Sequence, residues 1–267
     1  MAEQYAVIGN PVGHSKSPWI HTRFAQQCGQ DIEYAARLAP LDGFARSIKE
    51  LRAAGARGTN VTLPFKEEAC RLSDHLSDRA RAAGAVNTLT FSGSEMHGDN
   101  TDGCGLARDL ANNIGFSMRG RRVLLMGAGG AARGVLLPLL GEMPAALVIG
   151  NRTVEKARQL AAQFPGVSAG AYQDLAGERF DLVINATSAG LTNTPVCLPP
   201  RIFSEGALAY DMVYGRKSDF LNRALADGAA RTADGLGMLV EQAAESFFIW
   251  RGVRPQTAPV LAELRAA

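Results

Sequence analysis

The chain has 267 residues, of which 46% are hydrophobic and 20% are charged. These are the values of a globular protein with a sizeable core, in one large domain or two of ordinary size. The formal net charge of +2 is too small to favour a nucleic-acid or membrane-surface binder.

The cysteines and histidines indicate a cytoplasmic protein without a metal. The cysteines at positions 28, 70, 104 and 197 form no C-x-x-C pair, which predicts reduced thiols. The histidines at 14, 21, 75 and 97 show no H-x-x-x-H or other ligand spacing, so no metal site is expected. The first residues lack the basic and apolar segments of a signal peptide, and no apolar run approaches membrane-spanning length.

The first third of the chain alternates strand and helix patterns. Short apolar runs predict strands at 5–9, 32–38, 58–62 and 87–91. Helices are predicted at 17–28, with Ser17 as N-cap and Pro18 in the first turn, and at 41–54. Residues 99–103 predict a turn that leads into a helix near 105–113.

The middle third is a second α/β series, followed by two helices. Continuous apolar runs, typical of a parallel sheet covered on both faces, predict strands at 123–126, 146–150, 167–171, 182–185 and 208–210. The predicted helices lie at 131–140, 154–164 and 218–226, and then at 236–250 and 259–266 without further strands.

A glycine-rich turn follows the strand at 123–126. Gly127 permits a tight turn, Gly129 lets the backbone approach a pyrophosphate, and Ala132 lets helix and strand pack closely. The first N–H groups of the following helix suit a diphosphate. We interpret this G-x-G-x-x-A pattern as a dinucleotide site; the alternative is an ordinary glycine-rich turn.

The residues after the next strand favour NADP over NAD. NAD sites place an acid there, about 20 residues after the glycines, to bind the ribose hydroxyls. This strand ends instead in Asn151-Arg152-Thr153, with Lys156 one turn later. Arg152 offers a planar fork for a 2′-phosphate. The alternative is a helix N-cap followed by surface cations.

We therefore expect an α/β protein of two domains with a cleft between them. A Rossmann-type NADP-binding domain would occupy residues 104–237. Because the last helices can return to the first unit, residues 1–103 and 238–267 would form a discontinuous substrate-binding domain. Its strand ends carry hydroxyls, amides, a lysine and an aspartate, which suit a polyhydroxylated anion.

Several segments, in this order along nearly the whole chain, resemble the shikimate dehydrogenase family. They are G-N-P-V-G-H-S-K-S-P, N-V-T-L-P-F-K, G-A-V-N-T, G-D-N-T-D-G, G-A-G-G-A-A-R-G, N-R-T, N-A-T-S-A-G and A-D-G-L-G-M-L-V-x-Q-A-A. The resemblance implies NADPH-dependent reduction of 3-dehydroshikimate to shikimate in chorismate and aromatic amino-acid biosynthesis. It implies a small-molecule substrate. The sequence does not give the oligomeric state and leaves both a monomer and a homodimer open.

The resemblance also implies roles for single residues. Lys66 corresponds to the catalytic lysine and Asp102 to its acidic partner. The substrate carboxylate would be held by Ser15 and Ser17, with help from Tyr214. The ring hydroxyls would be held, together with Lys66, by Thr62, Asn87, Asp102 and Gln242. Asn60 is expected near this set.

For the cofactor the resemblance implies a longer set of residues. It comprises Gly127, Ala128, Gly129, Gly130, Ala131, Asn151, Arg152, Thr153, Lys156, Thr187, Ser188 and Met212, with Gly235 near the nicotinamide and Asp78 as an acidic neighbour.

These side chains suit the chemistry, although each also has a plainer interpretation. A lysine ammonium can protonate and stabilise a developing alkoxide, and either Lys66 or Asp102 can set the pH dependence. Alternatively, Lys66 pairs with Glu67 or Glu68, and Asp102 caps a helix. For the whole chain the alternatives are a quinate/shikimate dehydrogenase that uses NAD, disfavoured by Arg152, and a non-catalytic sensor of shikimate-type acids, disfavoured by the intact Lys66 and Asp102.

Overall fold

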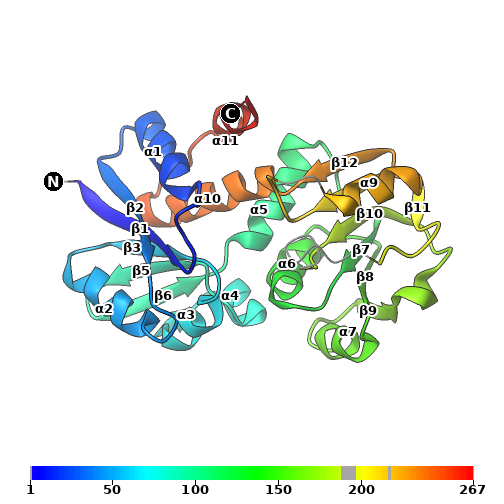
Figure 1. Cartoon of the computed structure of the whole chain (residues 1–267), viewed down its shortest axis with the longest axis horizontal. Coiled ribbons are helices and arrows are strands. Elements are labelled where there is room, and N and C mark those ends of the chain that lie inside the picture. The colour runs from blue at the N-terminus through cyan, green and yellow to red at the C-terminus, as the bar shows by residue number, and fades with distance from the viewer. Residues whose placement is uncertain (1, 188–196, 216–217, 267) are drawn as a thin grey trace. The chain divides into compact units, whose positions relative to one another are not determined.

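The computed structural model describes residues 2–187, 197–215 and 218–266 and divides the chain into two compact units. The first unit comprises Met1–Gly105 and Leu239–Ala267, and the second comprises Leu106–Met238. Each unit contains its own six-stranded sheet, and the predicted α/β fold class is confirmed (Figure 1).

The sheet of the first unit is mixed, with the strand order β2-β1-β3-β5-β6-β4. Strand β1 pairs in parallel with β2 and β3, whereas β5 pairs antiparallel with β3 and β6. The strands are β1 (Glu3–Gly9), β2 (Ile32–Leu38), β3 (Gly58–Val61), β4 (His75–Leu76), β5 (Thr88–Ser92) and β6 (Glu95–Asp99).

Helices from both segments of the chain belong to the first unit. They are α1 (Ser17–Cys28), α2 (Phe44–Ala53), α3 (Lys66–Leu72), α4 (Asp78–Ala83) and α11 (Thr257–Ala266). Two further helices, α5 (Asp102–Arg108) and α10 (Leu236–Arg251), continue along the chain from one unit into the other. The core contains apolar side chains from strands and helices alike, such as Ile8, Phe44 and Leu89.

The beginnings of two helices differ from the prediction. Ser17 is not the N-cap of α1, because it is already the first helical residue and Lys16 occupies the cap position. The hydroxyl of Ser15 instead accepts a hydrogen bond from the Ser17 N–H at 3.2 Å. Helix α2 begins at Phe44 rather than at 41, because the chain first turns where the Gly43 N–H donates to the Pro40 carbonyl.

The sheet of the second unit is entirely parallel, in the order β12-β11-β10-β7-β8-β9. This is the doubly wound order of dinucleotide-binding domains. Its strands are β7 (Arg122–Met126), β8 (Ala146–Asn151), β9 (Val167–Ala171), β10 (Phe180–Asn185), β11 (Phe203–Asp211) and β12 (Arg231–Asp234). The last strand is not predicted because it is a partly exposed edge strand without an apolar run.

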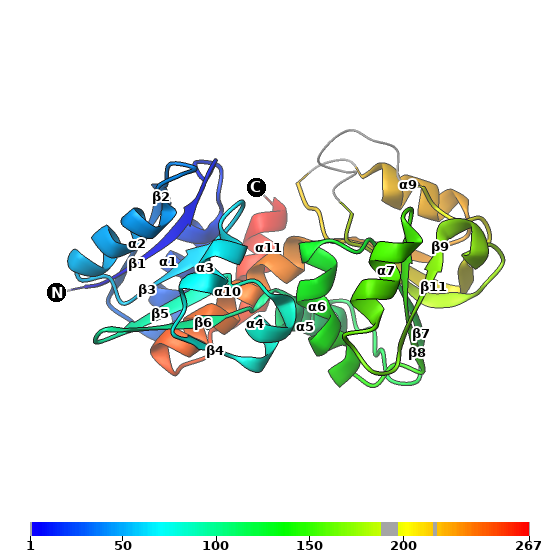
Figure 2. The same ribbon diagram turned by 90° about the horizontal axis from the view of Figure 1, so that it is seen from below.

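Helices pack along this parallel sheet. Helix α7 (Val154–Ala161) packs on β8 and β9, and α9 (Asp219–Ala226) packs on β11 and β12 (Figure 2). Helix α6 (Gly130–Gly141) follows β7 directly. A π-helical turn, η1 (Asp109–Asn113), and a 3-10 turn, η2 (Tyr172–Leu175), complete the described elements. The carboxyl ends of the strands, where ligands bind in such sheets, carry predicted cofactor residues at 127–131, 151–153 and 187.

Candidate functional site

Lys66 and Asp102 form a close ion pair in the first unit. Lys66 is the first residue of α3, shortly after β3 ends, and Asp102 is the first residue of α5, shortly after β6 ends. The Lys66 Nζ donates to the Asp102 Oδ2 at 2.6 Å, and the two side chains are 27% and 20% exposed. The pair is therefore partly shielded yet reachable from solvent, and it contradicts the pairing of Lys66 with Glu67 or Glu68.

Asn87 fixes the orientation of the Asp102 carboxylate. Its Nδ2 donates to Asp102 Oδ1 at 2.8 Å and to Thr101 Oγ1 at 2.9 Å. Its Oδ1 accepts from the Thr101 N–H at 2.9 Å, and Asn100 accepts from the Asp102 N–H at 3.1 Å. One carboxylate oxygen thus faces an amide while the other faces the lysine.

Two further amides extend this cluster. Gln242 of α10 accepts from Asn87 at 3.3 Å, so the C-terminal segment contributes a side chain to the same group. Asn60 of β3 is buried; it donates to Thr88 at 3.2 Å and accepts from the Tyr34 hydroxyl at 2.6 Å. The Asn60 Nδ2 also donates to the Asn87 backbone carbonyl at 3.1 Å, so Asn60 lies beside the predicted substrate residues.

Of the two predicted serines that follow β1, Ser17 is connected to this cluster through Tyr34, the partner of Asn60. Ser17 is buried, and its side chain hydrogen-bonds with Tyr34. Burial raises the pKa of Tyr34 well above 10.0, and the bond to Ser17 only partly opposes this, so the phenol stays neutral. Thr62 is half-buried directly after β3, where its N–H donates to the Ile8 carbonyl.

Of the predicted substrate residues, one belongs to the second unit. Tyr214 follows β11, and burial raises its pKa above 10.0. The others lie in the first unit: Ser15, Ser17, Thr62, Lys66, Asn87, Asp102 and Gln242.

The glycine turn after β7 begins at the buried Gly127 and reaches solvent at Gly129 and Gly130, where a pyrophosphate could approach the backbone. Gly127 has a φ of 109°, and a Cβ there would lie 3.2 Å from the Ala186 carbonyl, so glycine is required. Gly129 is the N-cap of α6 without a side-chain cap, and nothing lies within 4 Å of a Cβ placed on Gly129 or Gly130. The start of α6 therefore presents exposed backbone N–H groups to an anion. Of the other two predicted residues in this turn, Ala128 is half-buried and Ala131 is exposed.

Exposed cations follow β8, as a 2′-phosphate requires. Arg152 and Lys156 are exposed, and Arg152 forms no ion pair within the described part of the chain. Thr153 occupies the N-cap of α7, yet its side chain makes no capping hydrogen bond. Asn151 donates to the Thr153 carbonyl at 2.9 Å, which holds this turn without occupying the cations.

A buried polar pair supports the ends of β10 and β11. Thr187 Oγ1 donates to Asn185 at 2.7 Å, and Asn185 donates to Asp211 at 3.1 Å. Met212 follows Asp211, and a Cβ on Gly235 would lie 2.3 Å from the Met212 carbonyl oxygen. Thr187, Met212 and Gly235 are therefore held in one region of the second unit.

Asn185 and Asp211 were not among the predicted site residues. Burial raises the pKa of Asp211, and a hydrogen bond from Ser218 opposes that rise. Asn185 could have been found from its place at the end of a buried strand, within N-A-T-S-A-G. No motif in the sequence singles out Asp211. Its partners Val213 and Ser218 are near it in sequence, but Asn185 lies 26 residues earlier.

Two further residues complete the predicted cofactor set. Ser188 lies outside the described residues. Asp78 belongs to the first unit, where it begins α4 with its side chain 94% exposed and pairs with Arg81 at 3.1 Å.

Comparison with known proteins agrees with these features. The chain matches the shikimate dehydrogenase substrate binding domain over residues 7–89. It also matches shikimate / quinate 5-dehydrogenase over 109–195 and the shikimate 5'-dehydrogenase C-terminal domain over 235–265. It is 60% identical over 270 residues to shikimate dehydrogenase (NADP(+)) of Dechloromonas aromatica, covering 100% of this chain and 98% of that protein.

Solved structures resemble the whole chain. An Ael1 enzyme from Pseudomonas putida is 46% identical, with a TM-score of 0.94 and 98% of each chain covered. Shikimate 5-dehydrogenase from Thermus thermophilus, solved with NADP(H) and shikimate, is 34% identical, with a TM-score of 0.88 and 99% of each chain covered. Sequence, fold and relatives agree throughout: this chain belongs to the shikimate dehydrogenase family.

Proposed function

We propose that this chain catalyses the reversible NADPH-dependent reduction of 3-dehydroshikimate to shikimate, a step towards chorismate and the aromatic amino acids. The observation that carries the proposal is the 2.6 Å Lys66–Asp102 pair. It stands among amide and hydroxyl side chains that suit a polyhydroxylated substrate.

In this reaction Lys66 carries the proton, and Asp102 positions Lys66. Bound NADPH supplies a hydride to the carbonyl carbon. The Lys66 ammonium donates a hydrogen bond, and then a proton, to the carbonyl oxygen as it gains negative charge. Asp102 holds the Lys66 Nζ in place through Oδ2. In the reverse direction, neutral Lys66 accepts the proton of the substrate hydroxyl.

The remaining substrate residues bind and orient. We assign the substrate carboxylate to the hydroxyls of Ser15, Ser17 and Tyr214, which can each donate a hydrogen bond. We assign the ring hydroxyls to Thr62, Asn87 and Gln242. The hydrogen bonds that tie Asn87 to Thr101 and Asp102 support a preorganised site.

For the cofactor, we assign the pyrophosphate to the turn at 127–131 and the 2′-phosphate to Arg152, Thr153 and Lys156. The open backbone at Gly129 and the exposed cations after β8 support this assignment. Thr187, Ser188, Met212 and Gly235 would contact the rest of the nucleotide, with Asp78 as an acidic neighbour.

A steady-state assay of shikimate oxidation with NADP⁺ tests the role of Lys66. In Lys66→Ala we expect kcat to fall by about a hundredfold or more, the low end for general acid–base catalysis, while shikimate still binds by calorimetry. The matched control is Lys49→Ala, an exposed lysine on α2, which should keep the parent kcat. A Lys66→Ala enzyme as fast as the parent would refute the assignment.

The same assay with both nucleotides tests cofactor choice. Arg152→Ala should raise KM for NADP⁺ much more than KM for NAD⁺, because only NADP⁺ carries the 2′-phosphate. Arg158→Ala is the control: Arg158 is an exposed arginine on α7, which begins just after Arg152, but it pairs with Glu155 at 3.2 Å. Equal changes in the two KM values would show that Arg152 does not contact this phosphate.

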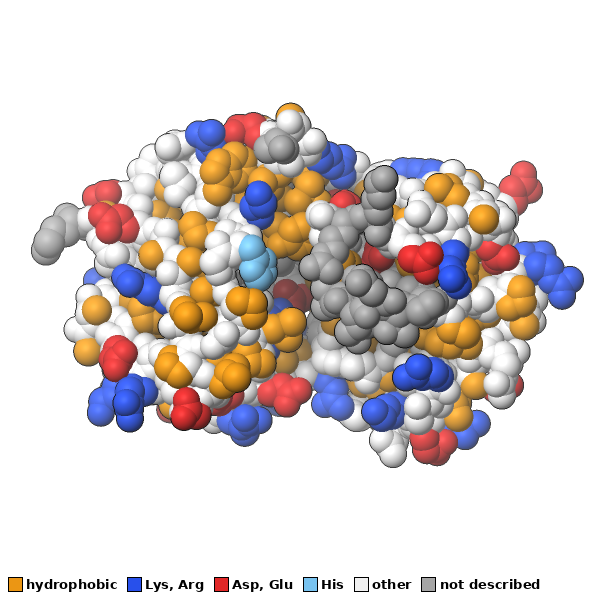
Figure 3. Space-filling model, in the orientation of Figure 1, with side chains coloured by type: hydrophobic (Ala, Val, Ile, Leu, Met, Phe, Trp, Pro, Cys, Tyr) orange, Lys and Arg blue, Asp and Glu red, His pale blue; other side chains and the backbone are white. Residues whose placement is uncertain are grey.

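The partners that we propose are small molecules alone. No described helix combines the length and apolar character that crossing a bilayer needs. On the face drawn in Figure 3, basic and acidic side chains are interspersed, and the net charge is only +2, so a nucleic-acid surface is not favoured. We propose a cytoplasmic enzyme that works as a monomer or a homodimer.

A further inference from the structure

Three exposed side chains with metal-binding atoms gather at one edge of the first sheet. Glu95 and His97 are two residues apart on β6, so the pleat directs both to the same face. His75 lies on the neighbouring edge strand β4, where it is the register partner of His97. The backbone pairing itself thus brings the three side chains together.

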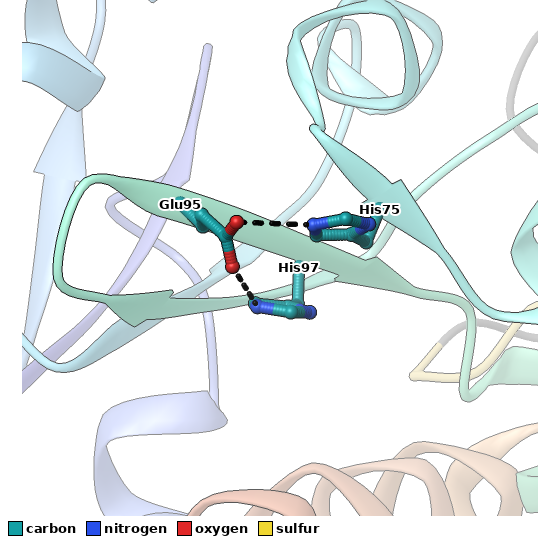
Figure 4. A group of neighbouring side chains, drawn as sticks. All are labelled: His75, Glu95 and His97. Atoms are coloured by element: carbon teal, nitrogen blue, oxygen red, sulfur yellow. Dashed lines mark ion pairs between the residues drawn. The ribbon is translucent and has the colours of Figure 1, made fainter.

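Their geometry is that of a compact donor set. The His75 Nε2 lies 3.5 Å from Glu95 Oε1, and the His97 Nε2 lies 3.6 Å from Oε2. The imidazole rings stack with centroids 4.8 Å apart, and each directs a nitrogen towards the carboxylate (Figure 4). One ligand atom from each residue lies within 4.8 Å of the other two.

Two imidazoles and a carboxylate are donors that zinc and its neighbours in the first transition row accept. With metal–ligand bonds of about 2.0–2.2 Å, ligand atoms of a tetrahedral ion lie roughly 3.3–3.6 Å apart. Each of the two nitrogen–oxygen distances is close to this value, but they end on different oxygens of Glu95. The side chains, 45–57% exposed, can rotate until one oxygen serves both nitrogens. Solvent can fill the remaining coordination positions.

We propose that His75, Glu95 and His97 bind one divalent transition-metal ion such as Zn²⁺. The ion would tie β4, which is only two residues long, to β6. It would act on the stability of this sheet edge and take no part in the proposed reaction. No metal site is expected from the sequence because the histidines lack a ligand spacing such as H-x-x-x-H, which places two histidines on one face of a helix. In this cluster the ligands come together instead through alternation along β6 and pairing between β4 and β6.

Zn²⁺ titration of the chelator-treated full chain, followed by calorimetry, tests the site. We expect one high-affinity ion per parent chain and a raised unfolding temperature, because a ligand that binds only the folded state stabilises it. His75→Gln and His97→Gln should each weaken Zn²⁺ binding by at least about tenfold, since even residues that merely support metal ligands cost 10–100-fold. Glu95→Gln should also weaken it, and Mg²⁺ should give no comparable heat.

The matched control is His14→Gln, an exposed histidine outside the cluster, which should bind Zn²⁺ like the parent. Co²⁺ should give a visible spectrum without a thiolate charge-transfer band, which separates this site from binding at the cysteines. Far-UV circular dichroism checks that each variant is folded. Unchanged Zn²⁺ affinity in His97→Gln, a thiolate band, or no Zn²⁺ binding by the parent at millimolar concentration would each overturn the proposal.

Discussion

His21 is a buried histidine that must remain neutral in the folded chain. Its ring stacks on Tyr34 at a centroid distance of 4.1 Å and lies against Trp250 at 5.5 Å. Neither ring nitrogen has a hydrogen-bond partner of good geometry among the described residues. Burial lowers the pKa of His21 from 6.5 to about 3, and the nearby Asn60 side chain only partly opposes this.

This shift predicts a loss of stability in acid. Between the unfolded pKa of 6.5 and the folded pKa of about 3, the unfolded chain binds a proton at His21 that the folded chain does not. The free energy of unfolding should therefore fall with decreasing pH, by up to about 1.4 kcal/mol per pH unit from this group. Urea unfolding between pH 7 and pH 4 measures the slope.

His21→Phe separates this contribution from that of the other groups. The phenyl ring retains the aromatic contacts but cannot titrate, so its pH slope should be shallower than that of the parent. His14→Gln, at an exposed position, should keep the parent slope. If His21→Phe and the parent lose stability equally with pH, His21 is not the source.

The main residues of the polar cluster could be predicted from the sequence, but the buried residues that hydrogen-bond to them could not. The motifs pointed to Lys66, Asn87, Asp102 and Gln242, and the structure brings those four together. Tyr34 gave no signal, because a tyrosine in an apolar run indicates only a strand. Its hydrogen bond to Asn60 spans 26 residues and depends on side-chain directions that a local pattern does not contain.

Among the elements, α4 and β6 are joined by one arginine. Arg79 of α4 donates to both carboxylate oxygens of Asp99, at 2.6 and 2.8 Å, and to Glu245 of α10 at 3.1 Å. Asp99 ends β6 and stands three residues before Asp102. The Arg79 side chain is 20% exposed, so this bidentate contact is worth more than a surface ion pair.

Arg79→Lys should therefore destabilise the chain while retaining the charge. An ammonium cannot reproduce the planar fork, and losing charge-assisted hydrogen bonds should lower the free energy of unfolding by about 2 kcal/mol. Urea unfolding at pH 7 measures this. Arg81→Lys on the same helix is the control: Arg81 is 65% exposed, so a change within about 0.5 kcal/mol is expected. If Arg79→Lys and Arg81→Lys changed the free energy of unfolding equally, the bidentate contact of the Arg79 guanidinium would not contribute to stability.

Strands with a continuous apolar run could be predicted from sequence, whereas β4 and β6, which lack one, could not. The strand predicted at 32–38 has the same bounds as β2, and that at 167–171 the same bounds as β9. Turn residues precede each run, at Gly29 and at Pro165-Gly166. Strand β6 has one apolar side chain, Met96, and β4 has two residues. Such elements are formed by pairing with neighbours, which composition does not reveal.

At the scale of the whole molecule, each of the two units contains a hydrophobic core cluster of its own among the described residues. One core cluster contains only residues of the first unit, such as Val61 and Phe91, and the other only residues of the second, such as Leu124 and Phe180. Each sheet pairs its own strands. Since burial of apolar surface is the main source of stability, each unit should respond to the ligand that it binds.

Amide hydrogen exchange of the full chain with single ligands tests this division. NADP⁺ alone at 100 times its Kd should slow exchange in β7, β8 and the 127–131 turn by up to about a hundredfold. A ligand that binds only the closed form lowers the population of the open form by a factor of 1 + [L]/Kd. Shikimate alone should protect β3, β5 and residues 99–103 instead. In Arg152→Ala, protection by the same NADP⁺ concentration should decrease while protection by shikimate stays. If NADP⁺ protected the first sheet and left β7 unprotected, the assignment of the two ligands to the two units would be wrong.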